Sequence, residues 1–367
     1  MERLEKKLYF IYNPLAGKGN IRGKLFEVIQ ALASAEYEVT VYPTREPRDA
    51  TERVRELPDG YDLVVCCGGD GTLDEVVTGM MQREEKLPIG YIPAGSCNDF
   101  ARSLQIPNNM QQAAEIAVRG QNFTVDVGSL NERNFVYVAA FGIFTDVSYS
   151  TKQGMKNVLG HMAYILEGMR RIASVKSYYL KVESEELCFE GDFLFGMVTN
   201  SKSVGGFKSI VGKNVIFDDG LFEVTFIKRP KNPMELQEIL AALTVSQIDT
   251  KYMYSFKSAR IAVESEEPVP WALDGEYGGE YTRAEIFNNP RAARIRIAPA
   301  VLESLRQEQE AAADAENIET TENTENTDNT ERTENTQNAA GEKRKTERMR
   351  NGRKDDDDCR DFRKKRI

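Results

Sequence analysis

Tyr61-Asp-Leu-Val-Val-Cys-Cys-Gly-Gly-Asp70-Gly-Thr72-Leu-Asp-Glu-Val-Val77 is the stretch that decides the fold. Its apolar run, Leu63–Cys67, is typical of a strand buried on both faces of a parallel sheet. Glycines then end the strand, and apolar residues at helical spacing indicate a helix directly after it. A strand, a glycine turn and a helix N-terminus form a site for an anion, because free backbone N–H groups point outward.

Asp70 stands inside this glycine turn, where its carboxylate would repel a bound phosphate. A divalent cation between the two groups would remove the repulsion. The alternative interpretation is a helix cap, because Asp is a common N-cap residue. Three glycines around Asp70 and Thr72 favour the phosphate site.

Length and composition bound the class of protein. The chain has 367 residues and is 41% hydrophobic, which is enough for two domains. No apolar run approaches the roughly 20 residues of a membrane span, and the charged start Met1–Lys7 is not typical of a signal peptide. The five cysteines show no CxxC or metal-ligand spacing, so we expect reduced thiols in a cytoplasmic protein. A net charge of -10 argues against nucleic-acid binding, and a single histidine, His161, argues against multi-histidine metal sites.

Strand-like and helix-like segments alternate through residue 122. The expected strands are Leu8–Tyr12, Glu38–Tyr42, Leu63–Cys67 and Pro88–Ile92, and the expected helices between them include Ile21–Leu32 and Arg48–Leu57. This alternation predicts a doubly wound parallel sheet, in which ligands bind at the carboxyl ends of the strands. The segments that would meet at that edge are Asn13–Lys18, Thr44, Gly68–Thr72 and Gly95–Asp99. The glycine-rich Gly17–Lys24 segment fits neither a P-loop nor a dinucleotide fingerprint.

The pattern changes after residue 122. Short alternating segments divided by turns predict a β-rich second domain, a sandwich, over residues 123–302. A return of its last segment to the first domain is left open. Two helical stretches interrupt it, Asn157–Ala173 and Pro233–Leu243. Residues 303–367 have no apolar face, and threonine recurs every third residue from Thr321 to Thr336, so we predict a disordered tail.

Trp271-Ala-Leu-Asp274-Gly-Glu276 combines an apolar approach with a turn that carries two carboxylates. A glutamate there is placed to act as a general base if a substrate hydroxyl reaches it. The alternative is a charged hairpin turn, which the hexamer taken alone favours.

Seven motifs occur in the order expected of one family. They are Asn13-Pro14…Gly17, Gly68-Gly-Asp-Gly-Thr72, Pro93-Ala-Gly-Ser-Cys-Asn98-Asp99-Phe100, Asp126-Val-Gly128, Gly205-Gly-Phe207, Asp218-Asp-Gly-Leu221 and Asp274-Gly-Glu276. From about Lys7 to Ala298 the chain resembles the diacylglycerol kinase catalytic family, in its soluble bacterial lipid-kinase branch. NAD kinases and phosphofructokinases share the Gly-Gly-Asp-Gly-Thr motif, whereas the Asp-Gly-Glu motif points to lipid kinases. Ser96 departs from the family, which usually has Thr there, but it keeps the hydroxyl.

The resemblance implies an ATP-dependent transfer of the γ-phosphate to the hydroxyl of diacylglycerol, which gives phosphatidic acid for phospholipid biosynthesis. The site is expected in the cleft between the two domains. Asp70, Asp99 and Asp126 would order magnesium and phosphates, and Glu276 would take the proton from the substrate hydroxyl. The residues implied to hold the nucleotide are Asn13, Thr44, Gly68, Gly69, Asp70, Gly71, Thr72, Leu73, Asp74 and Ser96. A second, structural magnesium would bind the Asp219 carboxylate and the carbonyls of Ile216 and Leu221.

Other functions stay open. The acceptor could be another lipid alcohol, such as a sphingoid base, a prenol or another glycerolipid, and a nucleotide or lipid sensor without turnover is a further alternative. A membrane-resident substrate predicts peripheral, reversible attachment to the inner face of the cell membrane. Either the Asn157–Ala173 helix, flanked by Lys156, Arg170 and Arg171, or the basic Arg363–Arg366 end would supply it. The oligomeric state is open, a homodimer included.

Overall fold

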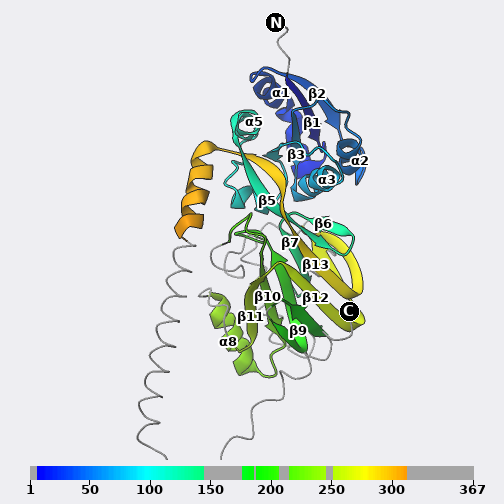
Figure 1. Ribbon diagram of the computed structural model, residues 1–367, viewed down its shortest axis with the longest axis vertical. Coiled ribbons are helices and arrows are strands. Elements are labelled where there is room, and N and C mark those ends of the chain that lie inside the picture. Colours follow the sequence, from blue (N-terminus) through cyan, green and yellow to red (C-terminus); the bar gives the residue numbers. More distant parts are fainter. Residues whose placement is uncertain (1–5, 144–175, 186, 206–214, 245–250, 312–367) are drawn as a thin grey trace, which may run out of the picture. The chain divides into compact units, whose positions relative to one another are not determined.

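The computed structural model describes residues 6–143, 176–185, 187–205, 215–244 and 251–311 (Figure 1). The chain divides into two compact units, Met1–Leu305 and Arg306–Ile367. All strands described below belong to the first unit. The predicted helix Asn157–Ala173 and almost all of the predicted tail lie outside the described residues.

The amino-terminal part is the predicted parallel sheet. Its strands are β1 (Lys6–Tyr12), β2 (Tyr37–Pro43), β3 (Leu63–Gly68) and β4 (Ile89–Pro93), in the order β4-β3-β1-β2. Every neighbouring pair among them is parallel. Each residue of β3 is buried, because both faces of the sheet are covered by helices, and this explains its continuous apolar run.

Helices connect these strands. They are α1 (Leu25–Ala33), α2 (Asp49–Arg55), α3 (Asp70–Met81), α4 (Asp99–Ser103) and α5 (Met110–Arg119). Helix α1 packs against α5 and α2 packs against α3, in two groups to either side of the sheet (Figure 1). The predicted helix over Ile21–Leu32 is wrong at its start. A 3₁₀ helix, η1 (Ala16–Gly23), precedes α1 there, and its Gly17 and Gly19 have φ angles of 52° and 78°, which a regular right-handed helix does not contain.

The second part is β-rich, as predicted. Its strands are β6 (Arg133–Phe135), β7 (Val138–Gly142), β8 (Tyr178–Ser184), β9 (Cys188–Thr199), β10 (Phe222–Lys228), β11 (Met253–Ser258) and β12 (Arg260–Leu273). Strands β7 and β8 each pair with both β9 and β12, so the strands fold over a second hydrophobic core that includes Trp271 and Phe141. Helix α8 (Pro233–Thr244) confirms the second predicted helix.

Two long strands join the parts. Strand β5 (Gln121–Leu130) runs antiparallel to the second half of β13 (Glu276–Ile297), while the first half of β13 pairs with β12. Ile295 of β13 also lies beside Ile89 of β4. The last strand therefore returns to the parallel sheet, and one continuous sheet runs through both parts (Figure 1).

The chain after β13 is helical over residues 299–311, past residue 303, where the tail was predicted to begin. Leu302 and Leu305 explain this difference, because both side chains are buried in the core of the first unit. Among the described residues, no helix is both long and apolar enough to cross a membrane.

Candidate active site

Two glycine turns touch at the carboxyl ends of β3 and β4. The Ala94 N–H donates to the Gly68 carbonyl at 2.7 Å. A Cβ built on Gly95 would lie 2.6 Å from the Cα of Gly69, so a side chain on Gly95 would force the two backbones apart. Gly69 is also the N-cap of α3, and the first helical hydrogen bond is the one that the Thr72 N–H donates to the Gly69 carbonyl at 3.0 Å, so the N–H groups of Asp70 and Gly71 precede it. The two turns thus leave a half-buried helix N-terminus that fits an anion.

Asp70, the first residue of α3, is ordered by the neighbouring turn. Its Oδ2 accepts the backbone N–H of Asp99 at 3.2 Å, and its buried Oδ1 has no hydrogen-bond partner among the described residues. Burial raises the pKa of Asp70 to about 6, and the negative charge of Asp99 adds to the effect. A buried carboxylate oxygen without a donor beside a second carboxylate fits a divalent cation, because such a cation would stabilise both charges.

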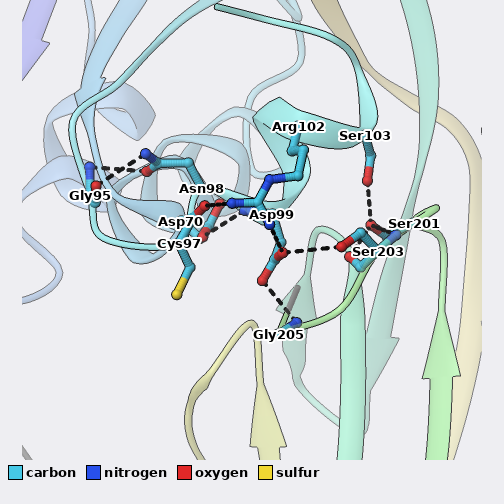
Figure 2. Close-up of polar contacts among 10 residues, drawn as sticks. All are labelled: Asp70, Gly95, Cys97, Asn98, Asp99, Arg102, Ser103, Ser201, Ser203 and Gly205. Atoms are coloured by element: carbon cyan, nitrogen blue, oxygen red, sulfur yellow. Dashed lines mark hydrogen bonds and ion pairs between the residues drawn. The ribbon is translucent and has the colours of Figure 1, made fainter. Parts of the chain in front are cut away.

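Asp99 connects the two parts of the chain (Figure 2). Its Oδ2 accepts the Gly205 N–H at 2.9 Å, its Oδ1 accepts the Ser203 hydroxyl at 3.4 Å, and Arg102 forms an ion pair with it at 3.3 Å. The Oγ atoms of Ser103 and Ser201 lie 2.7 Å apart in the same contact. The Asp99 side chain is 2% exposed, so it ties α4 to the loop that follows β9.

Asp99→Ala should therefore lower the free energy of unfolding by about 2–3 kcal/mol, since hydrogen bonds to charged groups contribute about 1.5–3 kcal/mol. Urea denaturation measures this difference. Asp59→Ala is the matched control, because the Asp59 side chain is 94% exposed, and its change should stay within about 0.5 kcal/mol. Equal midpoints for both variants would show that Asp99 does not hold the two parts together.

Asn98 shapes the turn before Asp99, and the motif that contains it predicted no role of its own for this side chain. Its φ is 51°, its Oδ1 accepts the Gly95 N–H at 2.9 Å, and its Nδ2 donates to the Gly95 carbonyl at 3.1 Å. The signal was its place in a glycine-rich turn, where Asn tolerates a left-handed conformation. Ser96 is exposed in this turn, in reach of a ligand.

Asn13 and Thr72 lie beside the first glycine turn. The Asn13 Nδ2 donates to the Thr72 hydroxyl at 3.5 Å, and a Cβ on Gly68 would lie 2.3 Å from that same oxygen. Thr44 follows β2, and its N–H donates to the Tyr12 carbonyl at 2.8 Å. These residues lie at one edge of the sheet, whereas Leu73 points into the core and is 1% exposed. Only the backbone of Leu73 is available to a nucleotide there.

Glu276 lies at the start of β13, directly against α3. A Cβ built on Gly71 would lie 2.3 Å from the Glu276 Oε1, so the carboxylate occupies the space that glycine leaves open. Asp274 fixes the turn before it. Its buried carboxylate accepts the N–H groups of Val136, Tyr137 and Val138 at 2.6, 3.0 and 3.0 Å. The φ angles of 50° at Asp274 and 84° at Gly275 make the turn tight enough to present Glu276.

Asp126 and Asp219 lie in a second group. Asp126 Oδ2 accepts the Gly220 N–H at 2.7 Å and the Asn288 amide at 3.2 Å, and its Oδ1 accepts the Arg291 N–H at 2.7 Å. Burial raises the pKa of Asp126, while these donors oppose the shift. The contacts tie β5 to β13 and to the turn before β10 rather than to the glycine turns. A role for Asp126 in ordering magnesium stays a prediction.

At the predicted structural magnesium site, the Asp219 carboxylate already has other partners. Asp219 Oδ1 accepts the Leu221 N–H at 2.9 Å, and Asp219 Oδ2 pairs with the Lys257 ammonium at 3.2 Å. Both oxygens thus have partners, and an ammonium beside them would repel a cation. Within the described ranges, no three His, Cys, Asp or Glu side chains are grouped to hold a metal ion. The ligand set Ile216, Asp219 and Leu221 stays a prediction, and we derive no step from it.

Comparisons with known families divide the chain as the fold does. Residues 7–130 match the family described as the diacylglycerol kinase catalytic domain. Residues 138–305 match the family described as the YegS C-terminal NAD kinase beta sandwich-like domain.

Whole proteins are similar over the same range. A Staphylococcus carnosus protein named diacylglycerol kinase is 33% identical over 280 residues, which are 76% of this chain and 90% of that protein. A Staphylococcus aureus protein of the same name is 34% identical and covers 76% of this chain and 88% of its own. A Bacillus anthracis crystal structure, assigned as a diacylglycerol kinase, has a TM-score of 0.70 at 27% identity and covers 82% of this chain and 98% of its own. The chain therefore belongs to the diacylglycerol kinase family.

Proposed function

We propose that the protein transfers the γ-phosphate of ATP to the hydroxyl of diacylglycerol and so forms phosphatidic acid. Membership of the family supports a lipid kinase, and the acceptor and the residue roles are our proposal. The observation that carries it is the contact between the Glu276 carboxylate and Gly71 at the N-terminus of α3. A base that touches the helix end suited to phosphate can reach a hydroxyl attacking that phosphate.

In this reaction, different residues would bind the phosphates, hold magnesium and accept the proton. The backbone at Gly69 and Gly95 and the α3 N-terminus would bind the phosphates. Asp70 would hold a magnesium ion, which when bound neutralises charge on the phosphates. Glu276 would take the proton from the acceptor hydroxyl. The oxygen of that hydroxyl would attack the γ-phosphorus, and ADP would leave. Thr44, Ser96 and Asn13 would contact the rest of the nucleotide.

Two alternatives keep the same site. The acceptor could be a sphingoid base, a prenol or another glycerolipid, or the protein could bind nucleotide and lipid without turnover. Incubation with magnesium, ATP labelled at the γ-phosphate and a panel of these lipids separates them. We expect the label in phosphatidic acid at the highest rate. Faster labelling of another lipid would change the acceptor, and label in none of them from folded protein that binds ATP would support a sensor.

Asp70 predicts how nucleotide binding depends on pH. Its pKa is raised from 3.8 to about 6, so the carboxylate is ionised, and able to hold magnesium, only above that pH. Affinity for magnesium–ATP should fall as the pH drops through about 6, and titration of a fluorescent ATP analogue with magnesium between pH 5 and pH 8 measures it.

Asp70→Asn, which cannot ionise, is the control and should bind weakly with no inflection near pH 6. The raised pKa of Asp70 affects folding stability in the opposite direction to nucleotide affinity. Native Asp70 holds an extra proton between pH 3.8 and about 6, so its contribution to stability falls as the pH rises through that window. A binding midpoint near pH 4 would contradict the assignment.

The acceptor also predicts a location. A diacylglycerol substrate resides in a membrane, so we propose peripheral and reversible binding of the protein to the inner face of the cell membrane. Sedimentation with anionic and neutral liposomes tests this. Absence of binding to every liposome, under conditions in which the kinase turns over, would contradict it.

A further inference from the structure

A cluster of three carboxyl groups lies between α3 and the turn that carries the proposed base. Asp74 comes from α3, and Asp274 and Glu276 come from the two sides of the β12–β13 turn. Helix α3 contacts both β6 and β13. The charges of Asp274 and Glu276 act directly on Asp74, and the guanidinium of Arg133 on β6 opposes them. We call Asp74, Asp274 and Glu276 the carboxyl cluster.

The members of the carboxyl cluster differ in their hydrogen-bond partners. Burial raises the pKa of Asp274 to about 7, while the three backbone N–H groups that its carboxylate accepts oppose this shift and stabilise its ionised form. Arg133 donates to the Tyr277 carbonyl at 2.9 Å, which orients its guanidinium along the same turn. Asp74 is the exception, because its buried Oδ1 has no hydrogen-bond partner among the described residues.

Three carboxylates beside one guanidinium cannot all be ionised without strong repulsion. Burial raises the pKa of Asp74 well above its usual range, and the charges of Asp274 and Glu276 raise it further. Because Asp274 has three N–H donors whereas the buried Asp74 Oδ1 has none among the described residues, we assign the shared proton of the cluster to Asp74. The other titratable groups that face the cluster are Glu75 on α3, Tyr137 beside Asp274, and Asp70, whose charge acts on Asp274.

We propose that Asp74 is a positioning residue that works as a neutral carboxylic acid and donates its proton in a hydrogen bond to the Asp274–Glu276 turn. Nucleotide binding was the role implied for Asp74 by sequence. A neutral acid attracts the Glu276 carboxylate toward α3, whereas an ionised Asp74 would repel it from the helix end. The inference rests on the proposed function, because it assigns Asp74 to the orientation of the proposed base.

The dependence of turnover on pH tests whether Asp74 is protonated. Wild-type turnover should fall on the alkaline side, as Asp74 ionises. Asp74→Asn keeps a neutral donor, so its profile should lack this alkaline limb. Asp74→Ala has no donor and should turn over about tenfold more slowly than Asp74→Asn, the effect of one hydrogen bond. Glu75→Gln, on the same helix, is the matched control and should keep the wild-type alkaline limb.

Infrared spectroscopy in D₂O detects the protonated Asp74 carboxyl group directly, without any substrate. At neutral pH the wild-type protein should show a protonated carboxyl band that Asp74→Asn lacks, and the band should titrate at the pH of the kinetic limb. An unchanged alkaline limb in Asp74→Asn, or a wild-type spectrum without the band, overturns the inference. A wild-type protein that shows the band but phosphorylates no lipid overturns the proposed function instead.

Discussion

Replacement of Glu276 by glutamine is expected to lower lipid phosphorylation about 10²–10⁴-fold, the usual contribution of a general base. Glutamine keeps the size of the side chain and its hydrogen bonds to neighbours but cannot accept the hydroxyl proton. Affinity for ATP should stay within a few-fold of wild type, because Glu276 contacts the end of α3 through a side chain that is not needed for phosphate binding. Turnover and nucleotide affinity are therefore measured on the same preparation.

A second carboxylate on the same strand controls for charge. Glu280, four residues further along β13, is also exposed, so Glu280→Gln changes the net charge by the same amount outside the Asp274–Glu276 turn. We expect its turnover to match wild type. Near-normal turnover of Glu276→Gln would place the proton acceptor elsewhere, and an equal loss in both variants would attribute the effect to charge alone.

Gly71→Ala should lower turnover about 10²-fold, which is the cost of misplacing a catalytic group by about 1 Å. The new Cβ would lie 2.3 Å from the Glu276 Oε1. That oxygen is the far end of a flexible side chain, so the carboxylate swings away at little cost in stability. Alanine is also a better helix former than glycine, by roughly 0.8–1.0 kcal/mol. Thermal unfolding should therefore show no loss of stability while the initial rate falls.

Gly23→Ala is the matched control, because a Cβ there has no heavy atom within 4 Å, and its rate should equal that of wild type. The double variant Gly71→Ala/Glu276→Gln shows whether the effect passes through the base. If it does, Gly71→Ala lowers the turnover rate only slightly in a protein that already carries glutamine at position 276. Additive losses would mean that the new methyl group blocks phosphate and leaves the base in place.

Local patterns in the sequence were sufficient for the elements that position the phosphates. The Leu63–Cys67 run and the glycines after it have few structural solutions, and β3 and α3 follow the prediction closely. The same holds for Asp274–Glu276, whose turn has the positive φ angles that its glycine suggests. Short α4 and the cap of α5 at Asn109 were missed, because four or five residues carry too little periodicity.

Contacts between distant segments could not be predicted in the same way. Asp99 was expected to order magnesium, yet its described partners Ser203 and Gly205 are separated from it by 104 and 106 positions. Asp126 similarly bonds Arg291, 165 positions away. Which carboxylates meet depends on the path of β13 back to the parallel sheet, and no local pattern contains that path.

The most direct test of the account is a single-turnover measurement with enzyme in excess over ATP labelled at the γ-phosphate, in micelles that contain diacylglycerol. We expect phosphatidic acid and ADP to appear in equal amounts at one rate, and Glu276→Gln to slow the formation of both while ATP remains bound. Formation of ADP without labelled phospholipid, or no transfer from a folded wild-type protein that binds magnesium–ATP, would contradict it.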